Sequence, residues 1–315
     1  MAVAMTGKFP KHLDRDIDRI FMNTYARYPK QFAKVARVIS FPKGNHLTEA
    51  HVSGLGHHRQ MGEGQGVDFD LPEEGREKTV YPIKFGLGFQ ITEEMVEDAV
   101  HPNIPKMASA LGISANHTLE LHFWDLFNSG DDVHKSDDDK FIFATDHETI
   151  KSGDTISNKT NAALSETALQ AHFEYYDTLV DEAGYPIFAN LNRLIVPTKL
   201  RWLAYTLAKQ KGGITDGSLD TAPSDGNLMT VNPENGYVDG WQPMVNRYLD
   251  PAFGGDDDNW FTLSDKHDMR LIWKRKIRME SADDFHTGNR LYKSTMRFNT
   301  AAFDYKGVCG SFVAS

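Results

Sequence analysis

The sequence has almost no cysteine and no long apolar run, and both absences narrow the kinds of protein that it can encode. Cys309 is the single cysteine among 315 residues, which excludes a framework of intrachain disulfides and fits a reducing cytoplasm. No apolar stretch approaches the roughly 18 residues of a membrane helix, and residues 1–10 lack the pattern of a signal peptide. We therefore expect a soluble protein without membrane contact, made in the cytoplasm, with Cys309 as a small packed residue.

Positive charge is also in short supply. The chain has 34 basic and 44 acidic residues and a formal net charge of −10, which disfavours a protein whose main task is to grip nucleic acid. The one dense basic cluster is Lys274-Arg275-Lys276 with Arg278. In a strand, Lys274 and Lys276 would share one face and Arg275 would lie on the other. We predict that these cations pair with acidic loops of a neighbour and form no DNA-binding stripe.

Motifs for catalysis or for cofactor binding are missing as well. Gly86-Leu87-Gly88 has no third glycine, and acidic residues follow where a phosphate would lie. No Gly-x-Ser-x-Gly elbow is present, and nothing in the sequence gives Cys309 a histidine partner. We predict no catalytic residue, no cofactor, no metal site, and therefore no enzyme.

Histidines and acidic runs fit no metal-binding template. The acidic runs 137–139 and 256–258 lack the fixed glycine and terminal glutamate of a calcium loop, so we expect solvated loops there. Four histidines fit no zinc spacing and are also expected in solvated loops: His46, His51, His57 and His58.

What the chain does have is enough apolar content, 40%, for a core in one large domain or two modest ones. Residues 1–44 show helical spacing of apolar groups in two stretches, around 17–25 and 32–39. Each stretch is short and marginal alone in water. We predict an arm that reaches a neighbouring subunit; two ordinary surface helices of one domain are the alternative.

Around residue 85 the chain changes character. Residues 45–80 are polar and rich in glycine, and an apolar strand is predicted over 79–91, with Val67, Phe69 and Leu71 alternating in the opposite limb as a paired strand would. A long segment of this kind cannot bury a core alone, which favours coverage by other subunits. A disordered linker between two domains is the alternative.

A helix is expected directly after this strand. Thr92 is a good N-cap because two acidic residues follow it in the first turn. A longer helix is then expected to end at about Asn128. We predict that Gly86 and Gly88 form a hinge between loop and helix, because glycine tolerates φ values that other residues avoid. Close backbone packing would explain the same glycines.

Further elements follow from spacing and stop signals. We expect a helix opened by the run Leu164-Ser165-Glu166-Thr167, a strand over 192–198, a helix over 200–211, a turn-rich stretch over 217–240, strands near Tyr248 and over 260–263, and alternating strands from 271 to 308.

Two motifs carry a family resemblance. They are Glu63-Gly64-Gln65-Gly66-Val67-Asp68, and Phe85-Gly86-Leu87-Gly88-Phe89-Gln90-Ile91-Thr92-Glu93-Glu94-Met95. The chain resembles the major capsid proteins of tailed bacteriophages, in the group with Mu-like head subunits. The resemblance implies an α+β fold of the Hong Kong ninety-seven type. Its implied parts are an N-terminal arm (1–44), an extended loop (45–90), a peripheral domain with a spine helix (91–199), an axial domain (200–273) and a return to the peripheral domain (274–315).

The same resemblance implies a function. Copies would assemble as hexamers and pentamers into an icosahedral shell around double-stranded DNA, with portal and scaffolding or decoration proteins as further partners, and the protein would reside in the virion. Some relatives join a loop lysine to an asparagine with the help of a glutamate. Lys78, Lys84 and Asn299 are present, but no motif ties them together, and this chemistry is not carried over. An encapsulin-like compartment with an enzyme cargo and an unrecognised hydrolase are the alternatives.

Overall fold

The computed structural model describes residues 9–55, 57–64, 66–67, 69–71, 74–92, 94–95, 103–150, 153, 155–209 and 242–313. Contacts within the chain define two units. Unit 1 comprises Met1–Leu47, Val80–Phe123 and Arg270–Thr300, and unit 2 comprises Thr48–Thr79, Trp124–Met269 and Ala301–Ser315. No helix among the described residues is long and apolar enough to cross a membrane.

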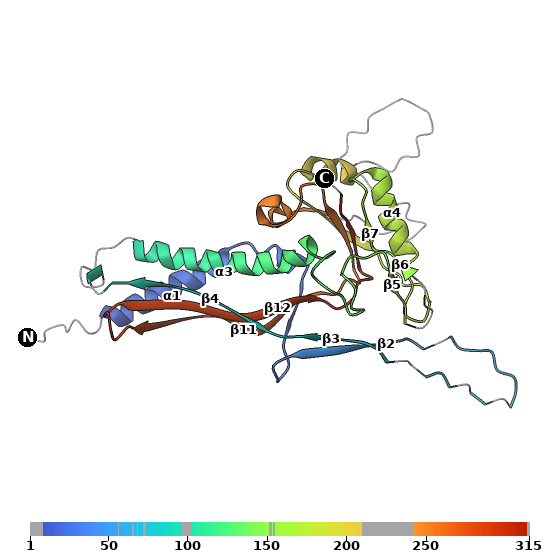
Figure 1. The fold of residues 1–315 in the computed structure, drawn as a ribbon, viewed down its shortest axis with the longest axis horizontal. Helices are drawn as coiled ribbons and strands as arrows, with labels where there is room; N and C mark the ends of the chain where they lie inside the picture. Colours follow the sequence, from blue (N-terminus) through green and yellow to red (C-terminus); the bar gives the residue numbers. More distant parts are fainter. Residues whose placement is uncertain are drawn as a thin grey trace, which may run out of the picture. The chain divides into compact units, whose positions relative to one another are not determined.

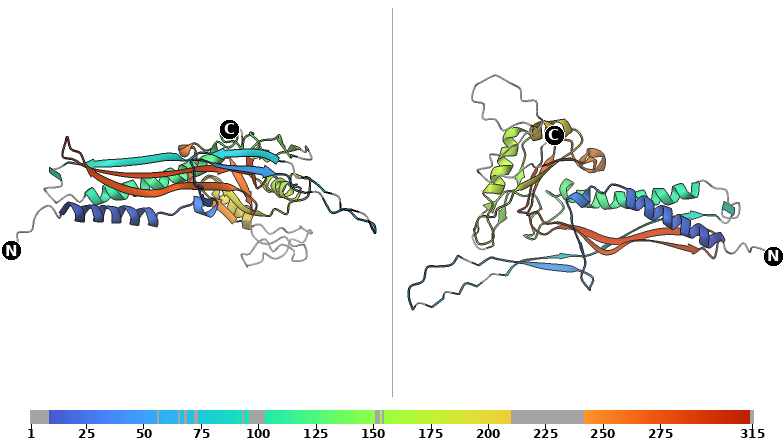
Figure 2. Two further views of the ribbon diagram at one scale, coloured as in Figure 1. Left: turned by 90° about the horizontal axis from the view of Figure 1, so that it is seen from below. Right: turned by 180° about the vertical axis from the view of Figure 1, so that it is seen from behind.

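Unit 1 is built on a four-stranded sheet with the strand order β1-β11-β12-β4. The strands are β1 (Arg37–Ser40), β4 (Ile83–Ile91), β11 (Met269–Asp283) and β12 (Arg290–Ala302). β1 runs parallel to β11, whereas β4 pairs with β12 in antiparallel register. Helices α1 (Phe9–Arg27) and α3 (Asn103–Asn128) lie on the same side of this sheet (Figures 1 and 2).

The long helix α3 presents its apolar stripe to this sheet and to α1. Its early Pro105 is tolerated because the first-turn N–H groups have no partner in a helix. Ile17 of α1, Ile91 of β4 and Ala108 of α3 belong to one buried cluster. Gly112 allows close approach of the helices, since a Cβ there would lie 3.0 Å from the carbonyl oxygen of Phe21. Tertiary packing thus fixes α1 on unit 1.

Unit 2 contains a five-stranded sheet with the order β7-β13-β10-β8-β9. The strands are β7 (Lys159–Thr160), β13 (Val308–Ser311), β10 (Trp260–Ser264), β8 (Leu191–Val196) and β9 (Gln242–Val245), and α4 (Glu166–Asp177) and α5 (Arg201–Lys209) accompany them. The Ser165 side chain caps α4 by accepting the Ala168 N–H. Burial lowers the pKa of His172 to about 3, so the ring is neutral where it stacks on Trp260.

Two short sheets complete unit 2. β2 (Leu47–Val52) pairs with β3 (Glu74–Val80), and β5 (His147–Glu148) pairs with β6 (Thr155–Ile156). We call Thr48–Thr79 the arm. Its described residues beyond the β2–β3 hairpin extend as a loop (Figure 1).

Two elements differ from the sequence prediction near the N-terminus and in the arm. Residues 32–39 form one 3-10 turn (Phe32–Lys34) followed by strand β1, because pairing with β11 overrides the helical spacing. The predicted strand 79–91 is two strands, β3 and β4, interrupted at Tyr81-Pro82, where proline cannot donate to a ladder. Val67, Phe69 and Leu71 lie outside any strand; β2 is the partner of β3.

The C-terminal half also departs in places from expectation. Tyr248 lies in a 3-10 turn (Arg247–Leu249), which the Asn246 side chain caps, rather than in a strand. Residues 217–240 fall outside the described residues. The two units follow boundaries other than those of the expected domains: Ala301–Ser315 belongs with Trp124–Met269, because β13 pairs with β10. Assignment of peripheral and axial domains stays a prediction.

Candidate functional site at the root of the arm

The base of the arm, which we call the root, consists of β2, β3 and the loops of unit 2 that contact them. Alternation along β3 turns Arg76 and Lys78 inward and Glu77 outward. Gly75 is required there, since a Cβ would lie 2.6 Å from the His51 carbonyl oxygen. The hairpin therefore lies tightly against its own unit.

Lys78 anchors the arm by donating its Nζ protons to two backbone carbonyls. One is the oxygen of Ala302 at 2.6 Å, and the other is that of Lys135. Burial lowers the pKa of Lys78 to about 8, although the carboxylates of residues 137–139 favour the charged form. The ammonium is thus held in place at an electrostatic cost that those carboxylates only partly offset.

Two carboxylates hold the other inward-facing groups of the hairpin. Arg76 Nη1 lies 3.7 Å from Asp138 Oδ2 and donates to the Glu148 carbonyl oxygen at 3.3 Å. His51 Nδ1 lies 3.5 Å from Asp137 Oδ2. The expectation that the run 137–139 is a solvated loop is therefore wrong for Asp137 and Asp138, which are buried because the arm covers them.

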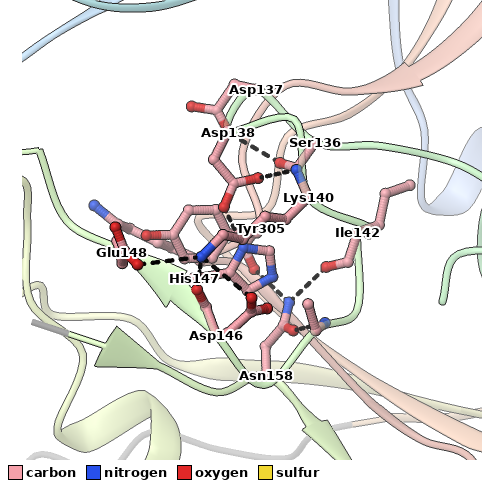
Figure 3. Close-up of polar contacts among 12 residues, drawn as sticks. Ser136, Asp137, Asp138, Lys140, Ile142, Asp146, His147, Glu148, Asn158 and Tyr305 are labelled. Carbon is pink, nitrogen blue, oxygen red and sulfur yellow. Dashed lines mark hydrogen bonds and ion pairs between the residues drawn. The ribbon is translucent and has the colours of Figure 1, made fainter.

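Asp138 is also bound from below by a buried histidine (Figure 3). His147 Nδ1 and Asp138 Oδ2 are 2.6 Å apart, and the His147 ring stacks on Tyr305 with centroids 3.9 Å apart and planes inclined by 2°. Burial opposes ionisation of Asp138, but the bond from His147 and the nearby Arg76 outweigh it and lower the pKa of this carboxyl. Asp138 thus joins β3 to β5 as a carboxylate.

A second buried ion pair supports the same region. Lys306 Nζ contacts Glu182 Oε1, and Glu182 Oε2 accepts the Ile150 N–H at 2.6 Å. Burial raises the pKa of the neighbouring Asp304. Among the described residues, no group of three or more His, Cys, Asp or Glu could hold a metal ion. The ion pairs and hydrogen bonds of the root fix the arm against its own unit.

The arm beyond the root exposes apolar side chains instead of burying charged ones. We call the described residues of this part, from Gly54 to Leu71, the tip. Large apolar side chains are exposed there: Phe69 by 93%, Leu71 by 80%, Val67 by 65% and Leu55 by 60%. Such a series of exposed apolar groups marks an interaction surface in a soluble protein. His57 of the tip contacts the Tyr185 hydroxyl, through its N–H at 2.8 Å and its Nδ1 at 2.9 Å.

The structure places the predicted hinge and cap residues as follows. Gly86 and Gly88 lie inside β4, opposite Thr295 and Lys293. A Cβ on Gly88 would lie 2.6 Å from the Tyr292 carbonyl oxygen, so close packing accounts for this glycine, and the hinge stays a prediction. Thr92 Oγ1 accepts the Met95 N–H at 3.4 Å, the geometry of an N-cap.

The cysteine, asparagine and histidines considered in the sequence analysis lie in the following surroundings. Cys309 is buried in the core of unit 2, and burial raises the pKa of its thiol. Asn299 donates to the Tyr81 carbonyl oxygen at 2.8 Å, and Lys78 donates to the carbonyl oxygens of Ala302 and Lys135. His46, His57 and His58 are exposed. The sequence analysis did not identify Arg76, His147 or Tyr305 as residues of the root. The one pattern that could have pointed to the root is the pair of basic residues at alternate positions of β3.

Comparison with known proteins agrees with this architecture. No curated protein sequence matches the chain. Among solved structures, the capsid of cyanophage P-SCSP1u is similar with a TM-score of 0.61 and 10% identity, over 92% of this chain and 89% of that one. The mature capsid of bacteriophage PhiM1 gives 0.61 and 9%, over 91% and 88%. A virus-like particle from Pyrococcus furiosus gives 0.51 and 9%, over 95% and 98%.

At these identities the three structures show a common fold. The sequence itself goes further, because the model of the family described as phage capsid protein matches residues 76–311, most of the chain. That match begins at Arg76 in the root and includes both long strands of unit 1 and the sheet of unit 2. The chain therefore belongs to the phage capsid protein family, and it is a major capsid shell protein with the mixed helix-and-sheet fold of phage capsids.

Proposed function

We propose that the arm is the element through which copies of this capsid protein join into a closed shell. The observation that carries the proposal is the exposed apolar tip on a root that the chain itself buries. Subunits that overlap by such arms cover surface that none could bury alone, and obligate contacts of this kind bury roughly 2,000 to 5,000 Å².

The shell would be icosahedral and built from hexamers and pentamers. It would enclose double-stranded DNA, and the subunit would meet portal and scaffolding or decoration proteins during assembly, in the cytoplasm of the host. The role is structural, and we expect no turnover of a substrate. Negative-stain electron microscopy and size-exclusion chromatography of the purified protein test this, with hollow particles or rings expected. A stable monomer at micromolar concentration, under every assembly condition, would contradict it.

Contact with the packaged DNA would be weak. Much of the dense basic cluster is engaged within the chain: Lys274 Nζ donates to the Pro42 carbonyl oxygen at 3.1 Å, Arg275 Nη2 donates to Thr295 Oγ1 at 2.9 Å, and Arg278 lies 2.8 Å from Glu280. Strong affinity for DNA requires several phosphates to be neutralised together. Unassembled subunits should therefore hardly retard duplex DNA at physiological salt. Sub-micromolar binding that weakens steeply with added salt would overturn this.

An encapsulin-like compartment is the alternative that the sequence left open, and the family match does not favour it. The two candidates differ in their contents. Particles purified from cells that express the whole assembly should contain double-stranded DNA if the shell is a phage head. Particles that lack nucleic acid and hold one enzyme would favour the compartment.

A further inference from the structure

Strand β4 forms one end of the sheet in unit 1 and has an unpaired edge. Its nine residues pair with β12 on one side, and no strand lies on the other side among the residues that the structure describes. A long edge strand presents a row of free N–H and C=O groups that another chain can pair with. Neither proline nor a bulge blocks this edge, since the register with β12 is unbroken from Ile83 to Ile91.

The two faces of β4 differ sharply. Toward the helices it carries only apolar side chains, at alternate positions: Ile83, Phe85, Leu87, Phe89 and Ile91. The opposite face carries Lys84, two glycines and Gln90. Toward the open edge the apolar face is incompletely covered, because Leu87 is exposed by 55% and Ile83 by 45%. An added strand with one apolar face would cover both.

The polar face of β4 has an unfavourable charge arrangement. Lys84 stands directly opposite Arg297 of β12. Cross-strand neighbours lie about 5 Å apart at Cβ, and like charges in that position are destabilising. A carboxylate on an added strand would relieve this repulsion, so the edge favours a partner that is acidic on one face and apolar on the other.

The tip of the arm has that two-faced pattern. Val67, Phe69 and Leu71 would share one face of an extended segment, and Asp70 would lie on the other. In the single chain Val67, Phe69 and Leu71 belong to no strand and are largely exposed. Over the arm as a whole, seven acidic residues outnumber three basic ones, which suits a basic edge (acidic residues at 49, 63, 68, 70, 73, 74 and 77; basic residues at 59, 76 and 78).

We propose that the arm of one copy adds as a fifth strand to the free edge of β4 in another copy. Val67, Phe69 and Leu71 cover Leu87 and Ile83 on the apolar face, and Asp70 lies beside Lys84 on the polar face. Main-chain hydrogen bonds supply affinity, and the alternating side chains select the segment, as in other cases of strand addition. This inference rests on the proposed function of the arm and names the surface that receives it.

Disulfide crosslinking provides the test, because two cysteines on neighbouring strands can form a disulfide only if their side chains lie on the same face of the sheet. In assembled particles, Leu87→Cys should crosslink between subunits with Phe69→Cys, or with Val67→Cys or Leu71→Cys if the register is shifted. The matched control pairs Leu87→Cys with Asp70→Cys, which should give about tenfold less dimer because the two point to opposite faces. Lys84→Cys should show the reverse preference. Equal crosslinking of same-face and opposite-face pairs, or no crosslinking of either, would refute strand addition.

A measurement on the unaltered protein covers the case in which the cysteine variants do not fold. Hydrogen exchange of β4 amides is compared between free subunits and purified particles. Strand addition predicts that the edge-facing amides between Ile83 and Ile91 gain protection on assembly, whereas those paired with β12 are protected in both states. Particles that form without this gain refute the inference and leave the assembly function intact. Failure to form particles refutes the assembly function instead.

Discussion

The root and the tip of the arm belong to one segment of the chain, yet they are built by opposite rules. The root buries charged groups and pairs them: Arg76 with Asp138, His51 with Asp137, and Lys78 with two carbonyls. The tip exposes apolar groups, of which Phe69 is almost fully open to solvent. The root is completed by contacts within the subunit, and we propose that the tip is completed by other copies.

The largest effect is expected at the tip. Replacing Phe69 and Leu71 together by aspartate removes two apolar groups that would each contribute about 1.5–3 kcal/mol when buried at a contact. Assembly should be lost while the thermal unfolding of the free subunit is unchanged. Electron microscopy and calorimetry measure the two properties. The control is Phe188→Asp, at an 86% exposed position outside the arm, which should still assemble.

The next effect is expected at the root. Asp138→Ala leaves His147 and Arg76 without their shared carboxylate, and breaking a buried pair in this way costs about 3–5 kcal/mol. The free subunit should unfold at a lower denaturant concentration. Asp139→Asn is the matched control, because Asp139 is exposed and its φ of 59° suits asparagine. Equal stability of both variants would show that the root is not the anchor we describe.

A smaller effect is expected when two glycines of the arm, Gly75 and Gly66, are each replaced by alanine and the stabilities of the two variants are compared. A Cβ at Gly75 would press on the His51 backbone, so Gly75→Ala should cost about 1–3 kcal/mol and loosen the hairpin. Gly66 has open space around it and no left-handed φ, so Gly66→Ala should be close to neutral. Urea unfolding of the two variants gives the comparison. A neutral Gly75→Ala would mean that the hairpin is not held tightly against its unit.

The smallest effect concerns pH. The folded pKa of Lys78, about 8, lies below its ordinary value of 10.5, so the unfolded chain binds this proton more tightly. Stability should therefore rise by about 1–2 kcal/mol as pH increases from about 8 to 10.5, and should be lowest, for this group, below pH 8. Lys78→Met should abolish that rise. An unchanged pH profile in the variant would place the titration elsewhere.

Local signals predicted much of this fold, and long-range contacts explain what they missed. The helix that opens near Ser165, the long helix ending at Asn128 and the strand starting at Trp260 depend on nearby residues and could be predicted from them. Phe32–Lys34 looked helical, but the chain that follows pairs with β11, more than 200 positions away. Only the folded contacts reveal such pairing.

The candidate site was harder to predict for the same reason. Asp137 and Asp138 look like a solvated acidic run, and only the folded position of Arg76 and His147 buries them. The exposed face of Phe69 and Leu71 was visible as alternation, but it suggested pairing inside the hairpin. A sequence with alternating residues does not say whether its partner strand lies in the same chain or in another copy.

Limited proteolysis with trypsin, followed by mass spectrometry, tests the central contrast most directly. Arg59 lies in the exposed tip, and Arg76 lies in β3 with its guanidinium 3.7 Å from Asp138. We predict rapid cleavage after Arg59 in free subunits, protection of Arg59 in assembled shells, and resistance at Arg76 in both states. Equal cleavage after Arg59 in free and assembled protein, or rapid cleavage after Arg76 in free subunits, would contradict the account of an anchored root and a shared tip.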